Sequence, residues 1–177
     1  MGINIKSSLS IDPSVCMYLN ANDIIINKSS SFVYLKVPRG IEISKKGKIL
    51  HIVPLMKRTN ASIRAFFVRF KRLLKGVAYP ACKHMHLKGV GYKVSFNQEN
   101  KILCFKLGFS HTVDVKVPFF INVEIKKGNK LNLTSPLYSE LLDFSSSLTR
   151  LRKKDPYKGK GVVFLNKKLI LKQGKRQ

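Results

Sequence analysis

The chain has 177 residues, of which 44% are hydrophobic. This is enough for one medium domain or two small ones with a buried core, and it excludes a wholly disordered chain. Lys and Arg number 34 against 9 Asp and Glu, so the formal net charge is +25. Such a charge repels itself in a compact fold and predicts a polyanionic partner; nucleic acid is favoured over a membrane, because no run approaches the roughly 18–20 apolar residues of a spanning helix.

The first half of the chain predicts several short strands followed by a helix. Alternating runs predict strands at 15–19, 24–26, 32–37, 41–43 and 49–53, with turn-forming residues between them. Apolar residues from Ile63 to Leu74 recur at helical spacing and predict a helix. Thr59 or Asn60 is expected to cap its start, and Gly76 to end it in a left-handed conformation.

The second half predicts the same order of elements. Strands are expected at 85–96, 102–107, 113–117, 121–125 and 131–134. Leu141, Phe144 and Leu148 belong to an apolar stripe from 137 to 151 that predicts a helix, with Ser135 as its cap and Pro136 at its first position. Two further strands, 162–165 and 169–171, are expected on either side of a turn at 166–167, before a basic tail.

An internal repeat supports this division. Residues 41–55 and 123–137 match at Glu42, Ile43, Lys45, Lys48, Pro54 and Leu55 with a constant offset. A single apolar helix stripe and a single apolar sheet face must bury each other. The sequence therefore predicts the α+β class: two similar small domains, 1–78 and 79–177, each an antiparallel sheet packed on one helix.

Two glycine motifs resemble parts of nucleotide-binding loops. Residues 159–162 lack the spacing of a phosphate-binding P-loop and the Ser or Thr that would bind magnesium, and a helix precedes them instead of following. Gly89 and Gly91 lack the third glycine of a dinucleotide fingerprint and favour a strand that continues through Val94 with another backbone close by. Neither motif predicts a nucleotide site.

No set of residues predicts catalysis. Cys82, His84 and His86 would share one face of a strand, but without an obvious fourth ligand a zinc site is less favoured than an exposed strand. The carboxylates look isolated, and Ser110 and His111 are merely adjacent. We therefore predict no enzyme, cofactor or metal. The three cysteines lie in apolar stretches and predict reduced, buried thiols.

The basic residues are concentrated in two segments. Residues 148–177 contain eleven Lys or Arg and one acid, and residues 57–75 contain seven and none. This density predicts binding of a polyanion. Glycines beside lysines in 157–161 would let backbone N–H groups reach phosphates, and Tyr157 could stack on a base or sugar or else lie against Pro156.

Three motifs together carry a family resemblance. LKGVGYKV (87–94), LGFSHTVDVKVP (107–118) and DPYKGKGV (155–162) resemble, in order and spacing, the family of the sixth protein of the bacterial-type large ribosomal subunit. The likeness covers 83–177 closely and the rest loosely. It implies two similar domains from a duplication, and a noncatalytic role in binding large-subunit ribosomal RNA beside the sarcin–ricin loop and the stalk base, where translational GTPases dock.

The resemblance also implies which residues contact RNA. The chain departs from the family at Lys154-Asp155, where Pro-Glu is usual, and at 135–138, where a Gly-x-Asp-Lys turn is usual, so RNA contacts of that turn are in doubt. The candidates from the family motifs are Lys88, Gly89, Gly91, Tyr92, Lys93, His111, Tyr157, Lys158, Gly159, Lys160 and Gly161. Further basic candidates are Lys83, Arg150, Arg152, Lys153, Lys154, Lys167, Lys168, Lys172, Lys175 and Arg176.

The expected partners are large-subunit RNA, neighbouring ribosomal proteins and the GTPases that dock nearby, with no homo-oligomer. The lysine bias and the lack of a transit-peptide pattern predict an organelle-encoded protein of the mitochondrial ribosome, with plastid and bacterial ribosomes as alternatives. An RNA-processing or RNA-modifying enzyme, or a nucleic-acid-binding protein outside the ribosome, are the alternative functions.

Overall fold

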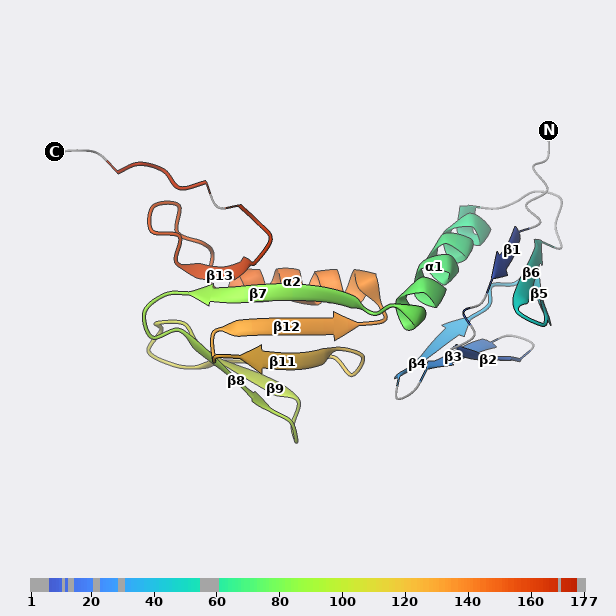
Figure 1. The fold of residues 1–177 in the computed structure, drawn as a ribbon, viewed down its shortest axis with the longest axis horizontal. Coiled ribbons are helices and arrows are strands. Elements are labelled where there is room, and N and C mark those ends of the chain that lie inside the picture. Colours follow the sequence, from blue (N-terminus) through green and yellow to red (C-terminus); the bar gives the residue numbers. More distant parts are fainter. Residues whose placement is uncertain are drawn as a thin grey trace. The chain divides into compact units, whose positions relative to one another are not determined.

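The computed structural model describes residues 7–10, 12, 15–20, 23–28, 31–54, 61–168 and 170–174. The chain divides into two compact units, unit 1 (Met1–Pro80) and unit 2 (Ala81–Gln177). Each unit combines antiparallel strands with one helix, so the predicted α+β class is confirmed (Figure 1).

Unit 1 contains two three-stranded sheets and a helix. One sheet has the order β1-β6-β5 and the other the order β2-β3-β4. The strands are β1 (Ser7–Ser10), β2 (Cys16–Leu19), β3 (Asp23–Lys28), β4 (Ser31–Lys36), β5 (Ile41–Lys46) and β6 (Ile49–Pro54). Ile24 and Ile26 of β3 are fully buried, and helix α1 (Ala61–Ala78) contributes Phe66 and Phe70 to the buried apolar residues of this unit.

Helix α1 runs past the residue that was predicted to end it. Gly76 lies inside the helix, which continues to Ala78. Val77 and Ala78 are buried, and their burial outweighs the roughly 1 kcal/mol that glycine costs in a helix interior. The helix ends before Pro80, which disfavours helical conformation at Tyr79. The predicted capping residues Thr59 and Asn60 lie outside the described residues.

Unit 2 contains a four-stranded sheet, a three-stranded sheet and helix α2 (Tyr138–Leu151). The four-stranded sheet has the order β11-β12-β7-β13, and α2 lies along one of its faces (Figure 1). The other sheet has the order β10-β9-β8. The strands are β7 (Ala81–Lys88), β8 (Lys93–Asn97), β9 (Ile102–Lys106), β10 (Val113–Lys116), β11 (Asn122–Lys126), β12 (Lys130–Ser135) and β13 (Gly161–Phe164).

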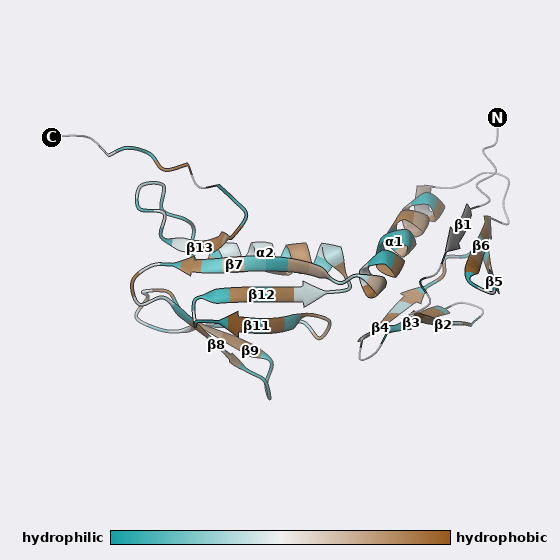
Figure 2. Cartoon of the chain, viewed as in Figure 1, coloured by the Kyte–Doolittle hydropathy of each residue, from teal (hydrophilic) through white to brown (hydrophobic). Residues whose placement is uncertain are grey.

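The core of unit 2 lies between these elements. Leu141, Phe144 and Leu148 of α2 are buried with Leu131 and Leu133 of β12 in one apolar cluster. Hydrophobic and hydrophilic residues both occur along α2 and the strands of this unit (Figure 2). The stripe predicted from sequence is thus the packed face of the helix.

The start of α2 differs from the prediction. Ser135 is the last residue of β12, paired with Ala81 of β7, so it cannot also be the helix cap. Its hydroxyl accepts a hydrogen bond from the Leu137 N–H at 3.1 Å, and Leu137 itself occupies the cap position without a side-chain bond. Pro136 precedes the helix.

The internal repeat corresponds to a repeated topology. The repeated sequences form the hairpins β5–β6 and β11–β12, each followed by a helix. In both units the first strand pairs with the last strand of the hairpin, and the three strands between form a separate sheet. Strand β13 is added beside β7 and has no counterpart among the described strands of unit 1.

Two predicted strands are wrong. The run 85–96 is broken at 89–92, where the Tyr92 N–H bonds the Gly89 carbonyl at 3.3 Å and the chain turns from β7 into β8. Residues 170–171 do not form the expected strand, and Leu169 lies outside the described residues. The segment instead lies beside the loop at 155–160, because the Lys172 N–H donates a hydrogen bond to the Pro156 carbonyl at 2.9 Å.

The cysteines also differ from expectation. All three are free thiols, but Cys16 and Cys82 are exposed and Cys104 is half-buried. Successive side chains of a strand point to opposite faces, so a residue between two buried apolar residues lies on the exposed face. Apolar neighbours in the sequence therefore do not ensure that a cysteine is buried. A hydrogen bond with Asp114, and then burial, raise the pKa of the Cys104 thiol.

Neither described helix has the length and apolar character needed to cross a membrane.

Candidate nucleic-acid interface

The segment 155–160 forms a closed loop between α2 and β13. The Asp155 N–H bonds the Lys160 carbonyl at 2.8 Å, and the Gly159 N–H bonds the Asp155 carbonyl at 2.9 Å. The Asp155 carboxylate accepts a further bond from the Tyr157 N–H at 2.9 Å. These bonds hold Lys158, Lys160 and the ring of Tyr157, which is 57% exposed, on the outside of the loop.

Gly161 fixes the position of this loop against the end of α2. A Cβ atom at Gly161 would lie 2.9 Å from the Cα atom of Lys154 and 3.1 Å from the carbonyl oxygens of Arg152 and Lys153. On the other side, Gly161 pairs with Lys88 at the end of β7. Close backbone approach thus brings the basic residues at the end of α2 next to Lys88.

The turn at 89–92 lies beside the loop that follows β9. The ring of Tyr92 comes within 2.8 Å of where a Cβ atom of Gly89 would be, and within 3.3 Å of the equivalent point at Gly108. Tyr92 is half-buried and packs against the core of unit 2. Its side chain therefore links the two loops and holds Gly91 and Lys93 at their exposed edge.

A three-membered stack joins the loop after β9 to α2. The rings of Phe109 and His111 are stacked with centroids 6.1 Å apart, and the guanidinium carbon of Arg152 lies 4.7 Å from the centre of the Phe109 ring. His111 and Arg152 are exposed, and Phe109 is 37% exposed. Sequence analysis missed Phe109, although a phenylalanine in a polar loop, between Gly108 and Ser110, was a usable signal.

These segments together form what we term the basic end of unit 2, residues 88–93, 107–112, 150–161, 167–168 and 170–172. The contacts above connect 88–93, 107–112 and 150–161, and the bond from the Lys172 N–H to the Pro156 carbonyl adds 170–172. Lys167 joins them because it lines one hollow together with Arg150, Lys153 and Lys154. Asp155 is the only carboxylate in these ranges. Its exposed cationic residues are Lys88, Lys93, Arg150, Arg152, Lys153, Lys154, Lys158, Lys160, Lys167, Lys168 and Lys172.

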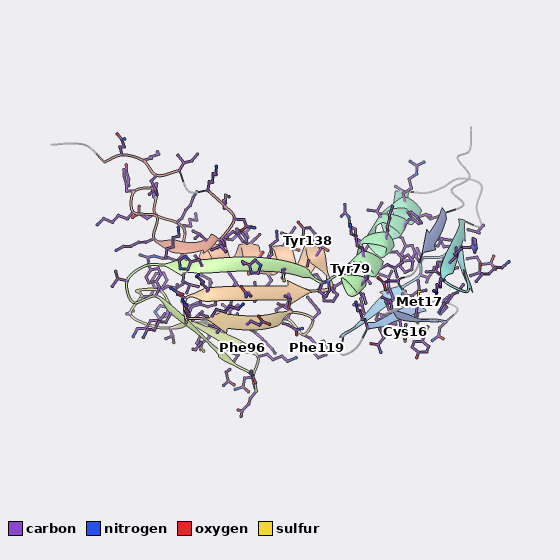
Figure 3. All side chains as sticks on the ribbon, in the orientation of Figure 1. Cys16, Met17, Tyr79, Phe96, Phe119 and Tyr138 are labelled. Atoms are coloured by element: carbon purple, nitrogen blue, oxygen red, sulfur yellow. The ribbon has the colours of Figure 1, made fainter. Side chains whose placement is uncertain are left out.

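Three predicted residues do not join this surface. Lys83 lies five residues before the end of β7, about 17 Å from Lys88 along an extended strand. Its ammonium group lies 5.6 Å from the ring centre of Tyr138, which begins α2 and is labelled in Figure 3. Lys175 and Arg176 lie outside the described residues.

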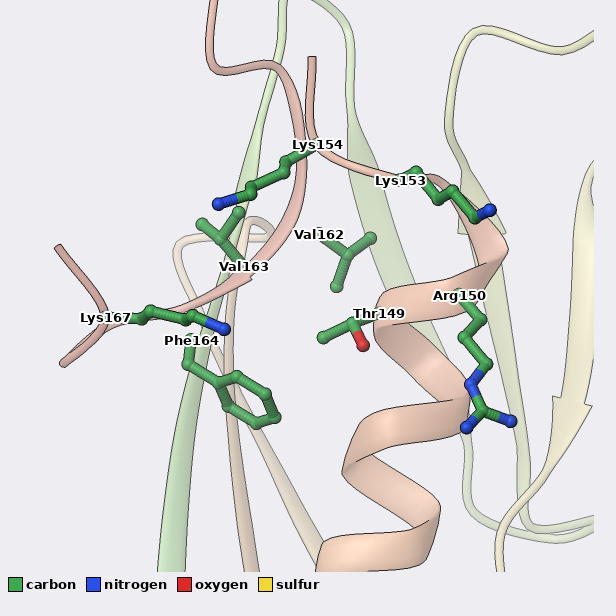
Figure 4. A pocket seen from close by; sticks show the side chains of 8 residues that line it. All are labelled: Thr149, Arg150, Lys153, Lys154, Val162, Val163, Phe164 and Lys167. Atoms are coloured by element: carbon green, nitrogen blue, oxygen red, sulfur yellow. The ribbon is translucent and has the colours of Figure 1, made fainter. Parts of the chain in front are cut away.

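A hollow of about 410 Å³ opens beside the end of α2 (Figure 4). Four cationic side chains line it: Arg150, Lys153, Lys154 and Lys167. The remaining lining consists of Val162, Val163 and Phe164 of β13 and Thr149 of α2. No carboxylate is among the lining residues.

The histidine and cysteine motif in β7 does not form a metal centre with other residues. The described residues contain no group of three or more His, Cys, Asp or Glu side chains able to hold a metal ion. His84 Nδ1 is instead 2.8 Å from Asn132 Oδ1 of the neighbouring strand. Burial, and then the charges of Lys88 and Lys130, lower the pKa of His86, which favours its neutral form.

Helix α1 carries a second set of cations. Its exposed basic residues are Arg64, Arg69, Lys71, Arg72 and Lys75, and the helix has no acidic residue. Lys57 and Arg58, from the same basic segment of the sequence, lie outside the described residues. A hollow of about 540 Å³ is lined by 35–39 and by Ala65, Phe66 and Arg69.

Comparison with known proteins decides the family. The chain is 31% identical over 175 residues to the large ribosomal subunit protein uL6c of Phaeodactylum tricornutum, covering 96% of each. The chain belongs to the uL6 family of large ribosomal subunit proteins. It is also 32% identical over 138 residues to uL6 of Desulfatibacillum aliphaticivorans, covering 76% of each, and 26% identical over 173 residues to uL6c of Arabidopsis thaliana, covering 96% of this chain and 77% of that protein.

No family model matches the chain. The uL6 relatives nevertheless confirm the resemblance predicted from the three sequence motifs. Membership of the uL6 family supports a structural role in the large ribosomal subunit, and it agrees with a fold of two sheet-on-helix units.

Proposed function

We propose that this uL6-family chain is a noncatalytic constituent of the large ribosomal subunit and that it binds large-subunit RNA through the basic end of unit 2. The observation that carries the proposal is the convergence of cations from separate segments at one end of the unit, where Asp155 is the only carboxylate. In keeping with the family, the binding site would lie beside the sarcin–ricin loop, near the stalk base where translational GTPases dock.

Binding would be mainly electrostatic. Lysines and arginines that contact phosphates release the counterions condensed on RNA, and this release favours association. Arg152 has the planar group suited to bidentate phosphate contacts, although its position over Phe109 also allows the pair to face a base or sugar. Base-specific readout would be a minor part of the free energy of binding.

The loop 155–161 would present side chains more than backbone amides. The N–H groups of Tyr157 and Gly159 already donate within the loop, so they are not available to phosphates as the sequence suggested. We propose that Gly159 and Gly161, which are buried, shape the loop, and that Lys158, Lys160 and Tyr157 make its RNA contacts.

We propose an organellar ribosome as the location. The relatives of this chain include plastid-type uL6c and bacterial uL6 proteins, which favours a plastid ribosome over the mitochondrial one preferred from sequence. In the ribosome, the chain would contact other large-subunit proteins. It would be present as a single copy and would not form a homo-oligomer. Recovery of the chain from purified mitochondrial ribosomes would contradict the plastid location.

The function is tested by replacing Lys158 and Lys160 together with glutamine. Both are exposed, so the fold should persist while two phosphate contacts are lost. At high salt, we expect the fraction that sediments with large subunits to be lower for the variant than for the unmodified chain. The matched control replaces Lys45 and Lys46, two exposed lysines of β5, with glutamine.

The control should cosediment as the unmodified chain does. If both double variants cosediment alike and retain the RNA affinity of the unmodified chain, the role proposed for the loop is wrong. A chain that never sediments with large subunits would instead contradict the ribosomal role as a whole.

A further inference from the structure

The hollow beside α2 combines features that neither a helical RNA backbone nor a free phosphate requires. Four cations surround it, yet Val162, Val163 and Phe164 supply an apolar lining. Phosphates alone need only the cations, whereas stacking of a base needs a flat apolar surface. The volume of about 410 Å³ falls within the roughly 300–1,000 Å³ of pockets that hold small molecules.

The side chains are arranged for such a ligand. Lys154 and Lys167 extend along the β13 side of the hollow, and the ammonium group of Lys167 is directed toward Thr149 and Phe164 (Figure 4). Arg150 and Lys153 lie on the α2 side, with their charged ends directed outward. The ring of Phe164 offers an apolar surface to a base, and the ammonium groups of Lys154 and Lys167 nearby offer charges to the phosphates on either side of that base.

We propose that this hollow receives one unpaired nucleotide of large-subunit RNA. The base would lie against Phe164, and Lys154 and Lys167 would hold the flanking phosphates. The inference rests on the proposed RNA-binding function and adds a binding site to it. A paired nucleotide cannot enter, because its base is held in the stack, so the RNA at this point must carry a bulge or a loop.

The test uses the full chain and two RNA hairpins that differ only in one bulged 2-aminopurine. Stacking on Phe164 should quench the fluorescence of the bulged base, and the chain should bind the bulged hairpin more tightly than the paired one. Phe164→Leu, which keeps an apolar side chain, should weaken binding of the bulged hairpin about tenfold, equivalent to about 1.4 kcal/mol, and leave the paired hairpin within about twofold.

Two variants serve as references. Phe119→Leu removes an aromatic ring that is 67% exposed elsewhere on unit 2 and should leave the preference for the bulge unchanged. Lys167→Gln changes an exposed residue, and it should weaken binding of the bulged hairpin more than of the paired one. This variant keeps the test valid even if Phe164→Leu lowers the melting temperature.

Equal affinity for the bulged and paired hairpins would overturn the proposal, and so would equal affinity for a hairpin whose bulge lacks its base. If, in that case, the paired hairpin still binds, and the double variant Lys158→Gln/Lys160→Gln still binds it more weakly than the unmodified chain does, only the hollow has been misassigned. The proposed function would then stand. In assembled large subunits, a photoreactive phenylalanine derivative at position 164 should crosslink to RNA. A crosslink to another protein instead of RNA would show a peptide as the occupant and refute the proposal.

Discussion

Among single residues, Gly161 allows the loop 155–160 to lie against the end of α2. Its φ of +139° belongs to a region that side chains rarely adopt, and three backbone atoms of 152–154 leave no space for a Cβ atom. Gly89 has a related role, because the Tyr92 ring occupies the position of its missing side chain. These glycines therefore determine where the neighbouring cations lie.

We predict that Gly161→Ala lowers the free energy of unfolding by about 2 kcal/mol, since the new methyl group would force residues 152–154 away from β13. Urea denaturation of the full chain measures the change. Gly174→Ala is the control, because nothing lies within 4 Å of the equivalent atom, and it should change stability by less than about 0.5 kcal/mol. Equal effects of the two substitutions would contradict this account.

At the scale of elements, the end of α1 depends on a contact distant in sequence. Lys28 of β3 donates from Nζ to the Ala78 carbonyl at 2.6 Å, and the same ammonium group lies 5.9 Å from the ring centre of Tyr79. A cation at this end also interacts favourably with the helix dipole. This bond joins the end of the helix to β3, in addition to the burial of Val77 and Ala78.

We predict that Lys28→Met, which keeps the apolar stem and removes the donor, lowers the stability of unit 1 by about 1–2 kcal/mol. Hydrogen exchange should increase first at the Tyr79 amide, which bonds the Lys75 carbonyl at 2.8 Å. Lys71→Met, at an exposed position of the same helix, should leave exchange at this amide unchanged. Faster exchange in both variants would show that lysine charge in general, and not this bond, supports the helix.

At the scale of the whole molecule, the net charge of +25 makes the ionic strength an important variable. Carboxylates are too few to pair with most of these cations. The folded chain therefore gains more from binding RNA at low salt than at high salt.

We predict that the logarithm of RNA affinity falls linearly with the logarithm of salt concentration, by roughly 0.7–0.9 per phosphate contacted. Replacing Lys158 and Lys160 with glutamine should reduce the magnitude of this slope by about 1.5, while replacing Lys45 and Lys46 should change it less. Titrations at several salt concentrations measure both slopes. Identical slopes for the two double variants would place the RNA contacts outside the loop 155–161.

Much of the fold could be predicted because periodicity is a local property. The stripe of Leu141, Phe144 and Leu148 and the alternating strands identified both units and their helices. Periodicity could not show that each unit divides its strands between two sheets, because strand pairing joins residues distant in sequence. It also could not show that Gly76 lies within a helix, because the helix continues through Gly76 owing to the burial of Val77. The predicted domain boundary between residues 78 and 79 stays a prediction.

Motifs and composition depend on residue types alone, so the family, the charge and a set of basic candidate residues could be predicted without a structure. Which cations converge depends on the fold, which places Lys83 near Tyr138, away from Lys88, and brings Arg152 onto Phe109. It also placed Phe164 and Thr149 beside Lys167 in one hollow. Backbone pairing of β13 with β7 and close packing at Gly161 bring segments distant in sequence together, and neither can be seen in the spacing of residues along the chain.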